Sequence, residues 1–279
     1  MDFRYFSRNG ELLLLEEAAI PLSNIEYQYG FGVYETIRVA EGTPVFLKDH
    51  LERLMESADI IGLKHVFAAT FVENSIAELI EKNGAGTYNT KILLIGGNEP
   101  VLFILCLNPL FPDKKLYRDG THFITYEYER IFPHAKTLNM LGSYLAYKKA
   151  KEAGAYDALL LTKQGCITEG TRTNFFCLKD RTIVSPPENE ILLGVTRKAA
   201  LTAARRNGFT IEEKPIGLYD LEKYDGAFIT STSSKILPAR SIDEHVFPRQ
   251  PEALKDLIRA FDEFLEGEER PHFEGPNKF

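Results

Sequence analysis

The sequence has few residues of the kinds that cross-link a fold or hold a metal: three cysteines, six histidines and no tryptophan. Cys106, Cys166 and Cys177 are odd in number and share no CxxC spacing, so they indicate neither a disulfide framework nor a zinc site. The histidines form no HxxxH or HxH pair, and we expect no metal. No apolar run approaches the roughly 20 residues of a membrane span. Charges interrupt the N-terminal apolar residues too early for a signal peptide, so we expect a cytoplasmic protein.

An excess of positive charge is also missing. The chain has 33 Lys and Arg against 40 Asp and Glu, a formal net charge of −7. This balance argues against nucleic acid or an anionic membrane as the main partner. With 279 residues, 44% of them hydrophobic and 26% charged, the chain is typical of a folded protein and can form one large domain or two.

Alternation and helical periodicity predict the elements of the first half. The run 33–39 alternates, which puts Tyr34, Thr36 and Arg38 on one side of a strand. The further elements that we predict are a hairpin around Asn9-Gly10, a strand over 44–47, a helix over 51–61 capped by Asp49, a helix over 71–82, and strands over 91–95 and 101–107.

Two prolines, a glycine and five charges make residues 108–120 the best candidate for a linker. We place the linker at 113–120, between a smaller N-terminal α/β domain (1–112) and a larger C-terminal β-rich domain with peripheral helices (121–279). The fold class is α+β, the first half more antiparallel than the second. In the second half we predict strands over 122–128, 156–162, 173–178 and 227–232, and helices over 138–153, 194–206 and 251–265.

One lysine differs in setting from the others of its stretch, HAKTLNMLGSYLAYKKAKEAG (134–154). Lys148, Lys149 and Lys151 fall where a helix would meet solvent, whereas Lys136 stands alone before the helix begins. A lysine before a helix is usually an ordinary solvated charge. Its wider sequence context permits a second interpretation, a reactive amine.

Four further stretches can carry chemistry, although each also has an ordinary structural interpretation. Glu169 follows a β run in CITEGTRTNFF, where it can be a simple turn residue. Thr196 follows Gly194 at the first turn of a helix, an arrangement that binds phosphate but is also a common helix start. Residues 229–235, ITSTSSK, form a hydroxyl-rich turn, and Arg53 lies beside the apolar stripe of an early helix.

Pyridoxal 5′-phosphate would use all five features. It needs a lysine amine for its aldehyde, an acid opposite its ring nitrogen, and a cationic, hydroxyl-rich cup for its phosphate. The carboxylate keeps the ring nitrogen protonated, so that the ring can hold the electrons released when the Cα–H bond of the substrate breaks.

The order and wording of the motifs resemble those of the fold-type-IV, or class IV, pyridoxal-phosphate aminotransferases. That family contains branched-chain aminotransferases, D-amino-acid aminotransferases and 4-amino-4-deoxychorismate lyases. The resemblance spans nearly the whole chain. It rests on YGFGVYETIRV (29–39), HLERLMESADIIGL (50–63), AKTLNMLGSYLAYKKA (135–150), ITEGTRTNFF (167–176), LLGVTRKAAL (192–201) and FITSTSSKILPARSID (228–243).

The resemblance implies a two-domain fold and a role for each matching residue. Lys136 would form the Schiff base and carry the proton at Cα, and Glu169 would pair with the pyridine nitrogen. Asn174 would support the cofactor from just after the glutamate strand. The phosphate would be held by Arg53, Val195, Thr196 and Thr232, and the substrate would be bound by Tyr29, Tyr34, Thr36, Arg38, Lys91 and Ser233.

The sequence departs from the family at the loop that follows the Lys91 strand. Many D-amino-acid enzymes and lyases have a longer, arginine-rich loop there that binds the substrate carboxylate, whereas this chain has only residues 96–100, GGNEP. Lys91 and Arg38 are the nearest cations, or else strand-edge charges. In the branched-chain enzymes the turn matching Thr232-Ser233 holds the carboxylate through backbone N–H groups, a route that needs no arginine.

The resemblance implies a homodimeric aminotransferase that moves an amino group between a branched-chain-like or D-amino acid and a 2-oxo acid by a ping-pong mechanism. The alternative is 4-amino-4-deoxychorismate lyase, which eliminates pyruvate. Thr36 keeps the lyase open, because lyases have a threonine there and the branched-chain enzymes usually have glycine. A catalytically silent binding protein is the rival outside enzymes; it predicts loss of Lys136 or Glu169, and both are present.

Overall fold

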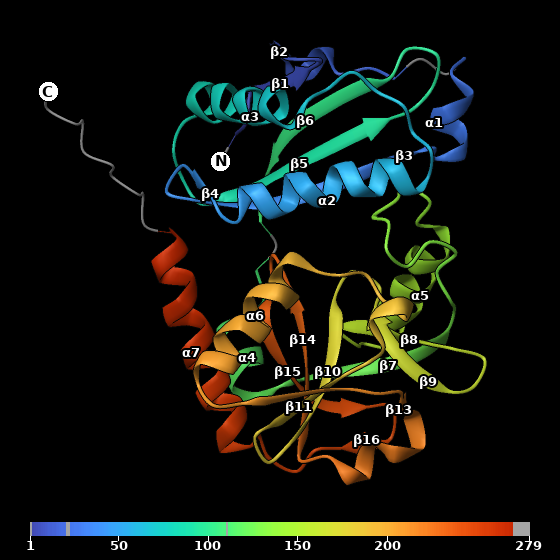
Figure 1. Ribbon diagram of the computed structural model, residues 1–279, viewed down its shortest axis with the longest axis vertical. Helices are drawn as coiled ribbons and strands as arrows, with labels where there is room; N and C mark the ends of the chain where they lie inside the picture. Colours follow the sequence, from blue (N-terminus) through green and yellow to red (C-terminus); the bar gives the residue numbers. More distant parts are fainter. Residues whose placement is uncertain (1, 21–22, 110, 270–279) are drawn as a thin grey trace, which may run out of the picture.

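Two β-sheets, one from each half of the chain, lie one above the other in the computed structural model, which describes residues 2–20, 23–109 and 111–269 (Figure 1). The upper sheet has six strands in the order β2-β1-β6-β5-β3-β4, and every neighbouring pair is antiparallel. Its strands are β1 (Tyr5–Arg8), β2 (Glu11–Leu14), β3 (Gly32–Ala40), β4 (Thr43–Pro44), β5 (Tyr88–Ile95) and β6 (Val101–Leu107).

The predicted hairpin around Asn9-Gly10 is confirmed. β1 and β2 are joined by these two residues, whose φ angles are 54° and 87°. Positive φ at both central positions is what a two-residue hairpin turn of the right twist requires, and Asn and Gly accept it most readily.

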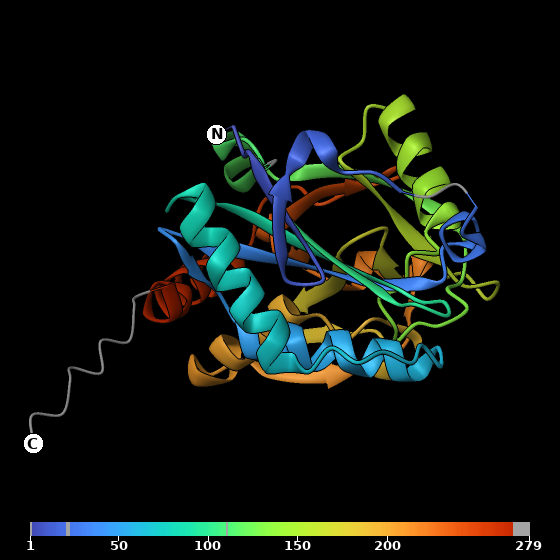
Figure 2. The same cartoon turned by 90° about the horizontal axis from the view of Figure 1, so that it is seen from above.

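Helices cover one face of the upper sheet. α2 (Leu47–Ile60) and α3 (Ala69–Asn83) lie on the same side of it, as Figure 2 shows, and their apolar residues form one core with the inward side chains of β3, β5 and β6. A short helix, α1 (Ile25–Tyr29), precedes β3. The opposite face of β3, with Tyr34, Thr36 and Arg38, is therefore left to face the lower sheet.

The prediction for the start of α2 was wrong. The chain turns from β4 into the helix at Phe46, the N-cap residue with a φ of 53°, and Asp49 lies within the first helical turn. Asp49 instead accepts a hydrogen bond of 2.6 Å from Lys198. An acidic residue is favoured both at the cap and in the first turn, so composition alone does not separate the two positions.

The lower sheet has ten strands and closes on itself. β10, β14, β15, β7, β8 and β9 pair in turn, and β9 pairs back to β10. The pairs β7–β8, β7–β15 and β11–β12 are parallel. Its strands are β7 (Thr121–Glu127), β8 (Asp157–Leu161), β9 (Cys166–Gly170), β10 (Asn174–Lys179), β11 (Thr182–Ser185), β12 (Thr210–Glu213), β13 (Ile216–Gly217), β14 (Gly226–Ser231), β15 (Lys235–Ile242) and β16 (His245–Val246).

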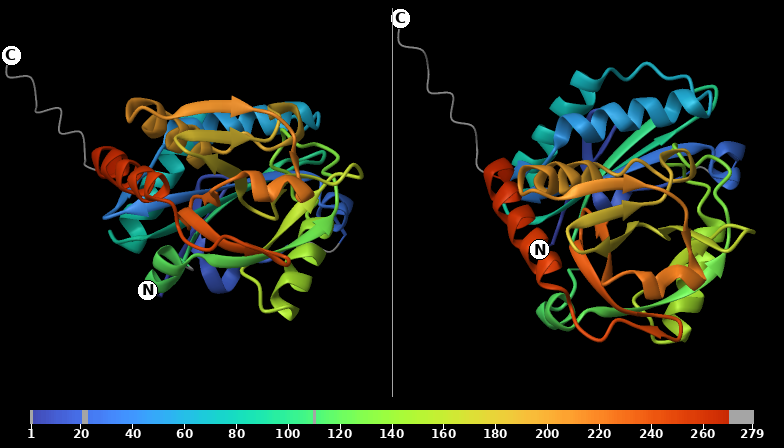
Figure 3. Two further views of the ribbon diagram at one scale, coloured as in Figure 1. Left: turned by 90° about the horizontal axis from the view of Figure 1, so that it is seen from below. Right: turned by 60° about the horizontal axis from the view of Figure 1, so that its bottom comes forward.

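Helices surround this lower sheet, with α6 and α7 on one side and α5 on the other (Figure 3). α6 and α7 pack on the apolar side chains of β10 and β14, and α5 packs on β7 and β8. These helices are α4 (Lys114–Asp119), α5 (Leu141–Glu152), α6 (Val195–Arg206) and α7 (Glu252–Glu269); three short 3₁₀ helices span Leu15–Glu17, Glu188–Glu190 and Leu218–Lys223.

The predicted α+β class is confirmed, with an antiparallel first sheet and a mixed second one. The segment predicted as a linker contains α4, and the domain boundaries stay a prediction. Among the described residues, no helix has the length and apolar character needed to cross a membrane. The cytoplasmic location also stays a prediction.

Candidate active site

Lys136 lies in the loop between β7 and α5, before the helix, where its backbone is tied to the upper sheet. Its N–H donates to Ser57 Oγ of α2 at 3.0 Å, and its carbonyl accepts from the Tyr34 N–H at 2.9 Å. These two bonds fix the lysine between the two sheets. By contrast, Lys148, Lys149 and Lys151 lie exposed on α5.

The Lys136 side chain is half-buried against an aromatic ring. Its Nζ lies 4.6 Å from the centroid of the Tyr34 ring, and Lys91 Nζ lies 5.4 Å from the same centroid. Burial alone would raise the pKa of Tyr34, but the positive charges of Lys136, Arg130 and Lys91 outweigh it, so this pKa is lowered. The phenol therefore lies in a strongly electropositive cleft.

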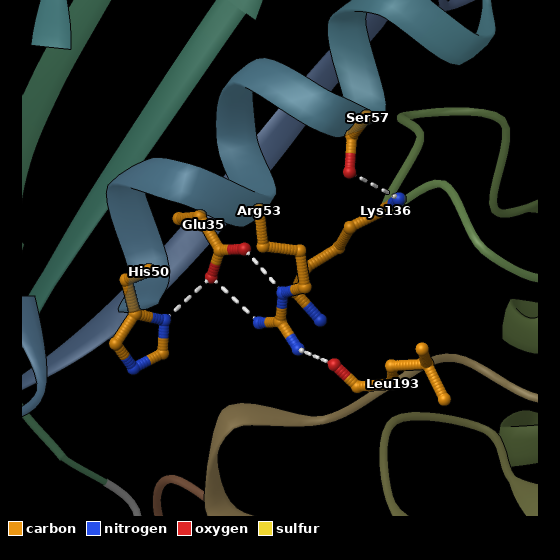
Figure 4. A network of polar contacts seen from close by, with 6 residues as sticks. All are labelled: Glu35, His50, Arg53, Ser57, Lys136 and Leu193. Atoms are coloured by element: carbon orange, nitrogen blue, oxygen red, sulfur yellow. Dashed lines mark hydrogen bonds and ion pairs between the residues drawn. The ribbon is translucent and has the colours of Figure 1, made fainter. Parts of the chain in front are cut away.

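A buried network of three charged or polar side chains adjoins this lysine (Figure 4). Glu35 of β3 accepts from Arg53 Nε at 2.7 Å and from Arg53 Nη2 at 2.8 Å, and it lies 2.8 Å from His50 Nδ1. Burial would raise the pKa of Glu35, but Arg53 and His50 outweigh it and hold this pKa at about 2. For His50, burial dominates over Glu35 and lowers the pKa.

Arg53 uses its remaining reach to contact the lower sheet. Its Nη1 donates to the Leu193 carbonyl at 3.2 Å. Figure 4 shows the Arg53 and Lys136 side chains extending into the same space between α2 and the Leu193 loop. The Glu35 network thus orients one guanidinium at the junction of the two halves.

Glu169 of β9 is buried on the opposite side of this space. Its Oε2 accepts from the Leu192 N–H at 3.3 Å, and its Oε1 lies 2.8 Å from Arg130 Nε. The Arg130 contact is ionic without hydrogen-bond geometry, so Oε1 accepts no hydrogen bond from the described residues. Burial raises the pKa of Glu169, opposed by Arg130, the Leu192 N–H, Lys136 and Arg53.

The loop before α6 is held by the side chains on either side of it. Asn174 Nδ2 donates to the Leu192 carbonyl at 2.6 Å, next to the bonds from Arg53 and Glu169. A Cβ at Gly194 would lie 2.1 Å from Asn174 Oδ1, so only glycine fits there. No side chain caps α6 at Gly194. Its first N–H groups, at Val195 and Thr196, are thus at the mouth of the cleft, where a helix N-terminus attracts anions.

The hydroxyl turn between β14 and β15 is internally braced. Ser234 N–H donates to Ser231 Oγ at 3.0 Å, and the Tyr156 hydroxyl lies 2.8 Å from Ser234 Oγ. Thr232 and Ser233 stand at the tip of the turn, half-buried. Asn89 Nδ2 of β5 donates to Ser233 Oγ at 3.1 Å, which joins this tip to the upper sheet.

The structure brings most of the predicted site residues to one cleft. Thr36 is paired with Lys91, and Arg38 with Asn89, on the face of β3 and β5 that carries Tyr34. Tyr29 is the exception, because it lies at the end of α1 and is 74% exposed.

Sequence reasoning missed Glu35, His50, Asn89 and Arg130 as site residues. For Glu35 a signal was available, since it is a charged residue on the side of β3 that is otherwise apolar. His50 is three residues from Arg53, one helical turn away on the same face. Asn89 and Arg130 acquire their roles only through contacts with Ser233 and Glu169, far away in the sequence.

Comparison with known proteins decides the family. The model of the family described as amino-transferase class IV matches residues 32–242. This chain belongs to the class IV aminotransferases. As a class IV aminotransferase it is 31% identical to the D-alanine aminotransferase of Bacillus licheniformis, over 84% of this chain and 87% of the relative. It is 30% identical to a putative branched-chain-amino-acid aminotransferase of Methanocaldococcus jannaschii, over 85% and 88%.

Solved structures of class IV aminotransferases share this fold. The branched-chain amino acid aminotransferase of T.th., with pyridoxamine 5′-phosphate, superposes with a TM-score of 0.88 at 26% identity, over 99% of this chain and 98% of that one. A branched-chain aminotransferase from Thermoproteus uzoniensis with norvaline gives 0.86 at 26% identity, over 95% and 96%.

The cofactor of this enzyme class is pyridoxal 5′-phosphate, and the cleft fits it. Glu169 Oε1 is a buried carboxylate oxygen without a hydrogen-bond donor among the described residues, which a protonated ring nitrogen would supply. Lys136 offers an amine from the other side of the cleft, and Arg53 with the N-terminus of α6 offers a cup for the phosphate.

Proposed function

We propose that this class IV aminotransferase moves an amino group between a branched-chain-like or D-amino acid and a 2-oxo acid, through Lys136. The observation that carries the proposal is the pairing of a backbone-anchored, half-buried Lys136 with the buried Glu169 carboxylate across one cleft. The two relatives named above, a D-alanine and a branched-chain aminotransferase, support this choice of substrates.

In this proposal the chain holds pyridoxal phosphate at both ends. Glu169 binds the ring nitrogen, and Asn174 keeps the loop at Leu192 in place beneath it. Arg53, Thr232 and the N–H groups of Val195 and Thr196 bind the phosphate, with Glu35 and His50 fixing the guanidinium of Arg53. When bound, the cofactor stores the electrons of the broken Cα–H bond.

Lys136 has two tasks in the proposed reaction. Its amine binds the cofactor aldehyde covalently at rest, and the amino substrate displaces it. The freed Nζ then takes the proton from the substrate Cα and returns it on the cofactor side of the same cleft. One product leaves before the second substrate enters, so the kinetics should be ping-pong.

The substrate in this proposal lies on the polar face of β3 and β5, beside Tyr34, Thr36, Arg38 and Lys91, and its α-carboxylate lies at the Ser233 turn. Asn89, which donates to Ser233, supports that turn. This arrangement replaces the arginine-bearing loop that the sequence lacks.

We propose a homodimer as the working form. Eight exposed apolar residues lie around one edge of the molecule, where α1, the Lys136 loop and α5 adjoin in Figure 1. A patch of this kind marks a protein interface. A second copy would bring its Tyr29 to the cleft, as the family resemblance implies. This apolar edge consists of Ile25, Tyr29, Phe31, Ile131, Phe132, Leu141, Tyr144 and Leu145.

The test is a visible spectrum of the purified holoenzyme during addition of single L-amino acids, D-amino acids and aminodeoxychorismate. A yellow band that bleaches with one hand of amino acid, and returns with a 2-oxo acid, supports the transferase and names its substrate. Pyruvate release from aminodeoxychorismate alone, without an acceptor, would instead assign the lyase that Thr36 permits. Lys136→Ala should abolish the band, and Lys148→Ala is the matched control that should keep it.

A further inference from the structure

A cavity of about 250 Å³ opens beside the Ser233 turn. Parts of the chain that are far apart in sequence line it: Arg38 from β3, Tyr117 from α4, Ser233 and Lys235 from the turn, and Asp262 from α7. The proposed site for the cofactor uses neither Tyr117, Lys235 nor Asp262.

This cavity continues the substrate cleft along β3. Tyr34, Thr36 and Arg38 follow one another on the same face of the strand, and the Tyr34 ring lies 4.6 Å from Lys136 Nζ. At about 3.3 Å per residue, the Arg38 backbone lies roughly 13 Å further along β3 than that of Tyr34. The cavity is therefore reached by the end of a substrate remote from the reacting carbon.

The polar lining of the cavity suits an anion. Arg38 and Lys235 supply two positive charges against the one negative charge of Asp262. The Arg38 guanidinium is held over the Phe111 ring at 4.9 Å. Burial, Tyr156 and Asp262 raise the pKa of Tyr117 to about 12 against the effect of Arg38, so its hydroxyl is protonated and can donate at neutral pH.

Lys235 is held ready by an ion pair and by an unusual backbone. Its Nζ lies 2.8 Å from Asp262 Oδ1, and the two side chains are 31% and 45% exposed, so the pair is open to exchange. Its φ is 54°, a left-handed conformation that costs a residue other than glycine or asparagine about 1 kcal/mol. The backbone alone would favour glycine or asparagine here, and the amine is what a lysine adds.

We propose that this cavity binds a second carboxylate, at the far end of the substrate, and that one of the two substrates is therefore a dicarboxylic amino acid or 2-oxo acid. Lys235, Arg38 and Tyr117 donate to that carboxylate, while Asp262 holds Lys235 when no ligand is present. This inference rests on the proposed function, whose α-carboxylate site at the Ser233 turn marks where the cavity begins.

The experiment is calorimetric titration of the holoenzyme with the saturated dicarboxylates adipate and pimelate, each compared with the monocarboxylate of the same length. Binding of these unreactive probes needs no turnover. At least one dicarboxylate should bind about fivefold more tightly than its monocarboxylate, the effect of one partly exposed ion pair. Equal affinities for both pairs of probes would overturn the proposal.

Two substitutions separate an anion site from a purely structural ion pair. Lys235→Asn removes a positive charge and tolerates the left-handed backbone, and it should remove most of the preference for dicarboxylates. Asp262→Asn removes the competing negative charge and should increase the preference, by about the same factor of five. A structural role predicts that both variants behave alike, because each breaks the same pair, and that result would also overturn the proposal.

The outcomes separate this inference from the proposed function. Opposite effects of the two variants on binding, with no amino transfer from any donor, would sustain the subsite and overturn the transferase. Amino transfer with no dicarboxylate preference would do the reverse. Thermal unfolding and the cofactor absorbance of both variants verify that they are folded and loaded.

Discussion

Glu35 is a charged residue in the core, and its value to the protein depends on its two partners. Replacing it by glutamine leaves the Arg53 guanidinium buried without an anion. We expect Glu35→Gln to lower the free energy of unfolding at pH 7 by about 3 kcal/mol and to weaken cofactor binding. Urea unfolding of the apoprotein and titration with pyridoxal phosphate measure both effects.

Lys148→Gln is the control for this loss. It breaks the exposed pair with Glu152, 3.9 Å apart on α5, and should change stability by less than about 0.5 kcal/mol. The pH dependence gives a second check. Because the pKa of Glu35 is lowered from 4.5 to about 2, its contribution is complete above pH 4.5 and is lost as the pH falls toward 2. The stability gap between wild type and Glu35→Gln should close over that range; a constant gap would mean that the charge is not its cause.

Glu169→Gln should have the opposite profile. Burial raises the pKa of Glu169, so its ionised form costs stability at neutral pH, and a neutral glutamine should leave the apoprotein at least as stable. The variant has no charge to hold a protonated ring nitrogen, and we expect amino transfer to fall about a hundredfold. Unfolding curves beside initial rates test this; a loss of stability with normal rates would assign Glu169 to structure alone.

At the scale of elements, the loop before α6 connects both halves of the site. A methyl group at Gly194 would collide with Asn174 Oδ1, only 2.1 Å away, and displace the amide that holds Leu192. We expect Gly194→Ala to weaken pyridoxal-phosphate binding about tenfold through this second contact. Equilibrium titration of the cofactor measures it.

A double variant shows whether Asn174 is the cause. In an Asn174→Ala background the obstacle is gone, so adding Gly194→Ala should cost much less than it does in the wild type. Additive losses would mean that the backbone at Gly194, rather than its neighbour, sets the effect.

Elements with a strong period could be predicted from the sequence, and those that break a rule could not. α3, α6 and α7 begin within two residues of their predicted starts, because each has a continuous apolar stripe. β15 was not predicted, since Pro238 lies in its middle and proline usually excludes an interior strand. The structure accommodates it next to an irregularity between Ala239 and Ser241.

The same division holds for the site. Lys136 and Glu169 could be predicted because the family motifs contain them and their order along the chain is informative. Arg130 could not, because nothing near it in the sequence indicates that it lies against Glu169. Side chains that act by holding another side chain have no local pattern, and their roles follow only from the fold.

At the scale of the whole molecule, the apolar edge is the feature that a single chain leaves unexplained. Tyr144 is 60% and Leu145 44% exposed on α5, next to the loop that carries Lys136. If a second copy covers this edge, the protein in solution should have twice the 31.6 kDa mass of the chain. Light scattering after size exclusion measures that mass.

A charge on the apolar edge should then separate the two copies. We expect the double variant Tyr144→Glu, Leu145→Glu to be a monomer, because a dimer interface cannot bury two unpaired carboxylates. Tyr219→Glu is the control, since Tyr219 is 92% exposed and lies outside this edge. The monomer should keep the Glu35–Arg53 network and its fold but lose most activity, because Tyr29 of the second copy no longer reaches the cleft. A monomer with full activity would remove Tyr29 from the substrate site.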